Sequence, residues 1–107
     1  MVESDTSEEL RRLYEADQHD RKEGLIDGLM ERDALRRARV EELVAAGALR
    51  TADDHFHAAL VFQHGGSVPN YWRAHELARV AAELGHPRGR WLAAAALDRW
   101  LVRQGKP

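Results

Sequence analysis

Helix-ending glycines constrain the fold of this chain more than any other sequence feature. Stretches with apolar residues at helical spacing end at Gly47, at the pair Gly65 and Gly66, and at Gly85. A side chain typical of helix starts, Thr51, opens the stretch after Gly47. No segment shows the alternation of apolar and polar residues that is typical of strands. The sequence therefore predicts an all-α protein.

The start and stop signals divide the chain into a compact bundle of about five helices. Thr6 to Glu9 has the form of a capping box, and Pro87 suits the first turn of the last helix. The boundary near residues 31–33 is the least defined, because one long bent helix also satisfies the pattern. We expect helices at about residues 6–30, 33–46, 52–64, 71–84 and 87–103.

The last two predicted helices form an αα-hairpin whose alanines permit close approach of the helix axes. The stretch Ala-Ala-Glu-Leu-Gly-His at 81–86 resembles the helix-turn-helix join of Sel-type, tetratricopeptide-like repeats. That resemblance covers one unit, and no second copy follows at a fixed period, whereas solenoids stack three or more units. We therefore predict a similar hairpin and not a repeat array.

Length and composition are those of one globular domain. The chain has 107 residues, of which 44% are hydrophobic and 32% charged. We expect residues 1–107 to form a single helical domain with flexible ends at 1–6 and 104–107. No apolar run approaches the length of a membrane span, and the acidic start lacks the features of a secretory signal. A cytoplasmic location is expected.

Several kinds of chemistry are disfavoured by the residue types. The chain has no cysteine, which excludes disulfides and thiolate ligands. The net charge is −2 with basic and acidic residues interleaved, so we expect no nucleic-acid surface. The arginine pairs at 11–12 and 36–37 are interpreted as solvated helix faces. His57 and His64 are two helical turns apart, about 10 Å, which is too far to share one metal ion, so we expect no metal site. We also expect no other cofactor.

Charged residues occur on stripes that should be apolar. In the first helix, Asp17 and Arg21 are spaced i,i+4 within a stripe that begins with Leu10, and they can pair with each other. Gly24 and Gly28 extend this stripe and leave space beside the charges. In the second helix we expect the buried face to be apolar, made of Leu35, Ala38, Leu43 and Ala46.

Two later helices repeat this pattern. Gln63 falls within the apolar face of the third helix, and His64 and His57 lie at its edge. Asp98, followed by Arg99, is at the centre of a fifth-helix stripe formed by Trp91, Ala95 and Val102. Three helices are thus predicted to direct polar groups inward.

Two interpretations of these inward groups are open. They are a buried structural network that fixes the register of the helices, or they line a pocket for a small polar metabolite and transfer protons. In the second case Asp17, Asp98 and His64 are the catalytic candidates. The candidates for binding or orienting the ligand are Arg21, Gln63, Arg99, Gln18 and His57.

A different class of function is a protein-interaction or regulatory module. The helical hairpin would then present Tyr71, Trp72 and Trp100 to a partner protein or to a second copy of the chain. Trp100 lies opposite the stripe that contains Trp91, so the fifth helix is apolar on two sides. That pattern predicts deep burial or a dimer face.

The same polar positions resemble the motifs of a bacterial domain family without an assigned activity. The family carries Asp-Gln-x-x-Arg, then Gln-His, then Asp-Arg, then Pro-Gln-x-Tyr-Gly-Thr-Gln, and the resemblance extends over nearly the whole chain. The resemblance supports the choice of these residues and favours a pocket over a purely structural network, and the family's last motif continues beyond the Pro with which this sequence ends. The matching positions are Asp17, Gln18, Arg21, Gln63, His64, Asp98, Arg99 and Gly105-Lys106-Pro107.

Overall fold

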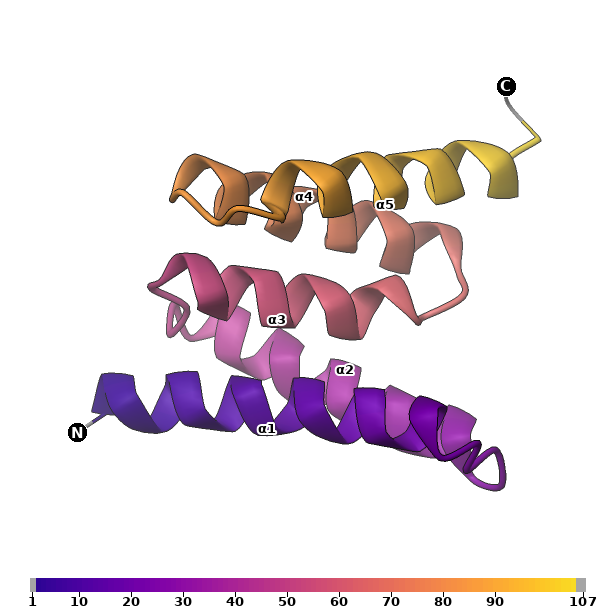
Figure 1. The fold of residues 1–107 in the computed structure, drawn as a ribbon, viewed down its shortest axis with the longest axis horizontal. Helices are drawn as coiled ribbons and strands as arrows, with labels where there is room; N and C mark the ends of the chain where they lie inside the picture. The colour runs from indigo at the N-terminus through magenta and orange to yellow at the C-terminus, as the bar shows by residue number, and fades with distance from the viewer. Residues whose placement is uncertain (1, 106–107) are drawn as a thin grey trace.

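The computed structural model describes the backbone of residues 2–105 and the side chains of residues 6–105. Within them the predicted all-α bundle is confirmed, and no strand is present (Figure 1). The five helices are α1 (Val2–Lys22), α2 (Leu29–Ala45), α3 (Ala52–Gln63), α4 (Val68–Glu83) and α5 (Gly89–Arg103).

The break between α1 and α2 comes earlier than predicted. Gly24 and Gly28 have φ angles of +66° and +74°, a region that only glycine adopts readily. Both glycines therefore belong to the connector between the two helices, and the prediction that they extend the α1 stripe is wrong. Helix α2 begins at Leu29 directly after the left-handed Gly28.

The start of α3 follows its predicted cap, whereas the starts of α4 and α5 differ from prediction. Helix α5 begins at Gly89, so Pro87, which we placed in its first turn, lies before the helix. Thr51 accepts a hydrogen bond from the Asp54 backbone N–H while the Asp54 side chain accepts from the Thr51 N–H, which is a complete capping box. Ser67, which we placed in a connector, caps α4 by accepting from the backbone N–H of Asn70. Helices α3 and α4 end just before glycine, as expected.

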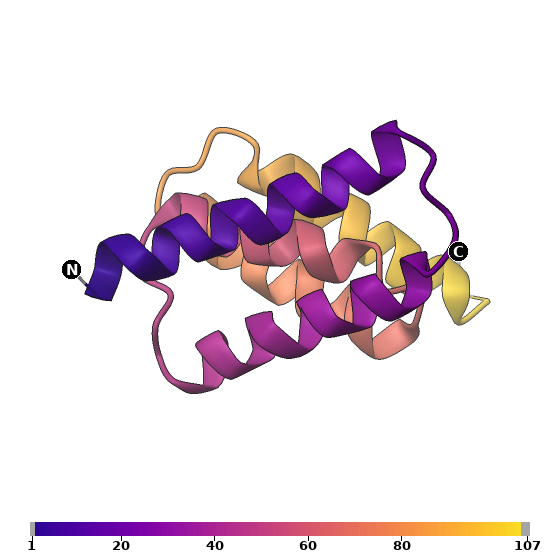
Figure 2. The same cartoon turned by 90° about the horizontal axis from the view of Figure 1, so that it is seen from below.

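Helix α3 is the centre of the bundle. It packs against each of the other four helices, whereas the backbones of α1 and α5 do not approach each other within the described residues. Figure 1 shows α3 between α1 on one side and the α4–α5 hairpin on the other. In Figure 2, α1 and α2 lie roughly side by side but apart, and α3 is visible in the space between them. The apolar core joins α3 to the hairpin and includes Leu10 of α1 and Val40 and Leu43 of α2.

Two predicted helix faces are wrong. On α2, Leu35, Ala38 and Ala46 are exposed, and of the four predicted residues Leu43 alone is buried. On α5, the stripe of Trp91 and Val102 faces solvent, while Leu92, Ala93 and Ala96 are buried. In both helices the buried face is defined by contact with the neighbouring helix and not by the largest apolar side chains.

Helix α1 begins earlier in the chain than predicted, so residues 6–9, which we predicted to cap its start, lie inside the helix. We predicted flexible ends at 1–6 and 104–107; Met1, Lys106 and Pro107 lie outside the described residues, whereas Val2 to Thr6 belong to α1.

No helix within residues 2–105 combines the length and apolar character needed to cross a membrane.

Candidate functional site

The buried carboxylate of Asp17 is the centre of a polar cluster between α1 and α3. Asp17 is only 1% exposed. Its Oδ2 lies 2.8 Å from Nδ1 of His64 and accepts a hydrogen bond from Nε2 of Gln18 at 3.1 Å. Its Oδ1 accepts a hydrogen bond from Nη1 of Arg21 at 2.5 Å. Both carboxylate oxygens are therefore bonded, which offsets the cost of removing the charge from water.

His64 reaches Asp17 because of how α3 ends. It is the C-cap residue of α3, and the chain turns away directly after it through Gly65 and Gly66, the latter with φ +75°. This turn leaves the imidazole at the end of the helix, 27% exposed, with Nδ1 toward the α1 carboxylate. The hydrogen bond to a carboxylate assigns the proton of the neutral ring to Nδ1.

Arg21 connects this pair to α2. Its guanidinium binds Asp33 through two hydrogen bonds, Nη2 to Oδ2 at 2.8 Å and Nη1 to Oδ1 at 3.2 Å. Asp33 Oδ1 also accepts from Nη2 of Arg36 at 2.8 Å. Because the Arg21 guanidinium binds both Asp17 and Asp33, its orientation is restrained, and it holds the Asp17 side chain in position.

The chain of alternating charges continues along the α1–α2 interface. Arg36 Nη2 lies 2.9 Å from Asp20 Oδ2, and Arg32 Nε donates to the same oxygen at 2.9 Å. Arg32 also donates to the backbone carbonyls of Asp27 and Leu25 in the connector. We call the following residues the ion network: Asp17, Asp20, Arg21, Arg32, Asp33 and Arg36.

The guanidiniums of the ion network lower the pKa values of two of its acids, Asp20 and Asp33. Burial by itself raises the pKa of Asp33, but hydrogen bonds from Arg21 and Arg36 outweigh it and lower that pKa below its ordinary value. The pKa of Asp20 is lowered chiefly by its hydrogen bond from Arg32. Three carboxylates face three guanidiniums, so the network carries no formal excess charge.

Most of this network was not predicted from the sequence. Asp20, Asp33 and Arg36 are buried, and the prediction that both arginines of the pair at 36–37 face solvent is wrong for Arg36. The signal was present, because Asp33, Arg36, Val40 and Leu43 recur at helical spacing on one stripe of α2. It was missed because a buried face was assumed to be apolar.

The remaining predicted residues of α1 and α3 lie at different distances from the pair. Gln18 is exposed on α1 beside it, and Gln63 is buried in α3 next to His64, with no hydrogen-bond partner for its Oε1 within the described residues. His57 is two turns, about 10 Å, from His64 along α3. Its ring stacks on Tyr14 with centroids 4.8 Å apart, and burial lowers its pKa.

Asp98 and Arg99 do not join this cluster. Both are exposed on the outer face of α5, and within the described residues the backbone of α5 does not approach that of α1. The expectation that Asp98 points inward toward Asp17 is therefore wrong. These residues do share one side of α5, as predicted, but that side faces solvent because α4 packs on the other side.

Two surface depressions lie to either side of the pair. One, of about 430 Å³, is formed between α1 and the start of α3 and includes His57 and Asp53. The other, of about 490 Å³, is formed by the α1–α2 connector and includes Asp20 and Arg32. Neither is lined by Asp17 or His64. Within residues 6–105, no group of three or more His, Asp or Glu side chains is arranged to hold a metal ion.

Comparison with family models, with curated proteins and with solved structures finds no match for this chain. The role of the Asp17–His64 pair is therefore inferred from its geometry and chemistry alone.

Proposed function

We propose that Asp17 and His64 form a proton-transfer and binding site for a small polar metabolite, acting without a cofactor. The observation that carries the proposal is the 2.8 Å contact between a fully buried carboxylate and a partly exposed imidazole, from residues 47 positions apart. A carboxylate that holds one ring nitrogen of histidine is a recurrent arrangement for acid–base work.

The pair would act through the second ring nitrogen of His64. With the proton on Nδ1, Nε2 is the acceptor, and no hydrogen bond within the described residues occupies it. When Nε2 takes a proton from a bound ligand, the Asp17 carboxylate stabilises the imidazolium that forms. His64 is then the general base and Asp17 its positioning and charge-stabilising partner.

The other predicted residues take supporting roles in this proposal. The exposed Gln18 amide, next to Asp17, is available to orient a ligand. Arg21 is a positioning residue, because its guanidinium already binds Asp17 and Asp33. In this proposal one cluster has two parts. The ion network is structural, because it holds α1 against α2 and positions Asp17, whereas the contact between Asp17 and His64 forms the ligand site.

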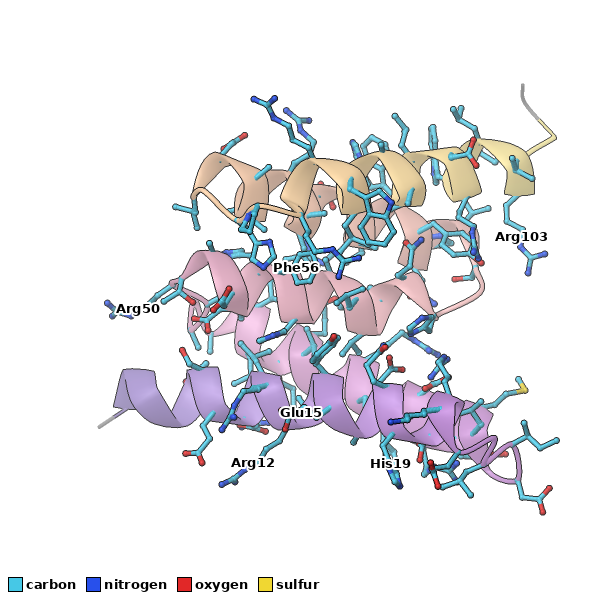
Figure 3. All side chains as sticks on the ribbon, viewed as in Figure 1. Arg12, Glu15, His19, Arg50, Phe56 and Arg103 are labelled. Atoms are coloured by element: carbon cyan, nitrogen blue, oxygen red, sulfur yellow. The ribbon has the colours of Figure 1, made fainter. Side chains whose placement is uncertain are left out.

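Nitrogen-15 NMR of the histidine side chains tests the proposal directly. We expect the neutral form of the His64 ring to carry its proton on Nδ1. We also expect metabolites from a polar-compound library to shift the Nε2 signal of His64 and the Gln18 amide. The same compounds should lose these effects in His64→Gln. His19→Gln is the matched control, because His19 projects from the side of α1 turned away from α3 (Figure 3).

A result against the proposal is equally clear. If His64 is protonated at Nε2, or if every bound compound shifts His64→Gln as it shifts the original protein, the pair has no role in binding and belongs to the structural network alone.

A second candidate function, an interaction module, is favoured by the aromatic surface. Trp91 is 55% exposed on α5, and Trp72 of α4 is partly exposed and packs on Trp100 with ring centroids 4.8 Å apart. Tyr71, which we expected on the surface, is buried. Light scattering coupled to gel filtration tests this candidate, and a mass that rises with concentration supports it.

A further inference from the structure

Two exposed apolar patches lie on opposite edges of the bundle. The first, which we call the connector patch, consists of Leu25, Ile26, Leu29 and Met30 between α1 and α2. Ile26 is 75% exposed and Met30 82% exposed, which is unusual for neighbouring apolar side chains. The second, the α5 stripe, consists of Trp91, Ala95 and Val102, and Val102 is 63% exposed. Figure 1 shows the connector at the lower edge and α5 along the upper edge.

The borders of the two patches carry opposite charges. The connector patch is bordered by the exposed acids Glu23, Asp27 and Glu31, whose carboxylates pair with no described side chain, and by one exposed lysine, Lys22, so its border is acidic overall. The α5 stripe is bordered by the exposed Arg90 and Arg99, whose guanidiniums have no described partner. Asp98, within the stripe, is the one acid on that face of α5. Uncompensated charges of opposite sign around apolar centres are the pattern of complementary interfaces.

The shapes of the two patches also complement each other. The connector bears the depression of about 490 Å³, lined in part by Leu25, Ile26 and Asp27. On the α5 stripe, Trp91 is a large exposed ring. One face of the ring packs on Arg88, whose guanidinium carbon lies 4.6 Å from the ring centroid. A supported, exposed indole is a typical anchor for a partner's pocket.

We propose that the connector patch of one molecule binds the α5 stripe of a second copy of this chain. The proposal deepens the second candidate function and rests on it. Since the two patches are on opposite edges, each copy offers both at once, and the contact is head-to-tail. Contacts of that kind generate rings or open chains of molecules and not two-fold dimers.

A pair of charge-reversal variants tests this contact. In Arg90→Glu/Arg99→Glu both patches become acidic, and in Asp27→Arg/Glu31→Arg both become basic. We expect each variant alone to associate at least about tenfold more weakly than the original chain, measured by sedimentation velocity, because like charges then face each other. An equimolar mixture should recover association, since acidic α5 then meets basic connector. Arg11→Glu/Arg12→Glu changes the net charge equally in the first half of α1, away from both patches, and should associate normally.

Any of three outcomes would overturn the proposal. The first is that the original chain stays monomeric at every concentration in low salt, and the second is that the mixture of variants fails to recover association. The third is that the control variant is as impaired as Arg90→Glu/Arg99→Glu. If the chain associates but the mixture does not recover, this pairing is wrong while the interaction-module function stands. Circular dichroism of each variant shows beforehand that the five helices are intact.

Discussion

The two helical hairpins of this protein are held together by different forces. The α4–α5 hairpin packs small apolar side chains against one another, and Gly89 lies so close to α4 that an added Cβ would be 2.6 Å from the backbone nitrogen of Ala82. The α1–α2 hairpin is joined by the ion pairs of the ion network, with Asp33 and Arg36 buried where apolar residues would be usual. One interface is apolar and close, and the other is charged and directional.

The difference teaches what each interface is sensitive to. Apolar packing is non-directional and responds to volume, because a lost methyl group leaves a cavity. A buried ion network responds to the removal of one charge, because the partners left behind are desolvated without compensation. The ion network also positions Asp17 for His64, so the charged hairpin supplies the carboxylate of the candidate site and the end of α3 supplies the imidazole.

Removing one acid from the ion network should have the largest effect. Asp33→Ala leaves Arg21 and Arg36 without their shared carboxylate, and we expect a loss of about 4 kcal/mol in the free energy of unfolding, measured in urea. Hydrogen exchange should speed up in α1 and α2 before α4 and α5. Glu31→Ala, exposed on the same helix, should cost about 0.5 kcal/mol or less. Equal effects of the two variants would show that the network does not stabilise the hairpin.

A core truncation sharpens the comparison from the apolar side. Leu92→Ala removes a buried side chain of α5, and we expect a loss of about 3 kcal/mol. Leu35→Ala is the matched variant on α2, where the leucine is exposed, and should change stability by about 0.5 kcal/mol or less. If Leu35→Ala were the more costly of the two, the arrangement of α2 in the structure would be wrong.

Acid should act on one hairpin more than on the other. The folded-state pKa values of Asp20 and Asp33 are below the ordinary value, so their stabilising effect is complete above about pH 4, where both are also ionised in the unfolded chain. It is lost as the pH falls below that value through the folded-state pKa values. We expect protection from hydrogen exchange to fall first in α1 and α2. Uniform loss over all five helices contradicts this expectation.

The smallest effect comes from His57. Burial lowers its pKa, so the folded state favours the neutral ring. The resulting contribution to stability is present above about pH 6.5, the ordinary value, and is lost as the pH falls through the folded-state pKa. A slight drop in melting temperature between neutral and mildly acidic pH should therefore be absent in His57→Phe, which keeps the stack on Tyr14.

The candidate site was predictable where local spacing and chain order were sufficient. Asp17 and Arg21 are one helical turn apart, and their pairing follows from that spacing. The motif pattern singled out His64, and the structure brings it to Asp17. Asp98 fails because its place on α5 was inferred from an apolar stripe, and an apolar stripe can face solvent or a partner molecule as well as the core.

Local sequence by itself determined that this chain is helical and where α3, α4 and α5 end, because caps and glycines act over a few residues through backbone geometry. Tertiary structure alone decided which face of α2 and of α5 is buried, and that Asp33 and Arg36 extend the Asp17–Arg21 pair. A helix with charged residues on one side and apolar residues on the other does not reveal which side meets a neighbour. That choice depends on partners distant in the chain, which can stabilise buried charge as effectively as apolar packing stabilises leucine.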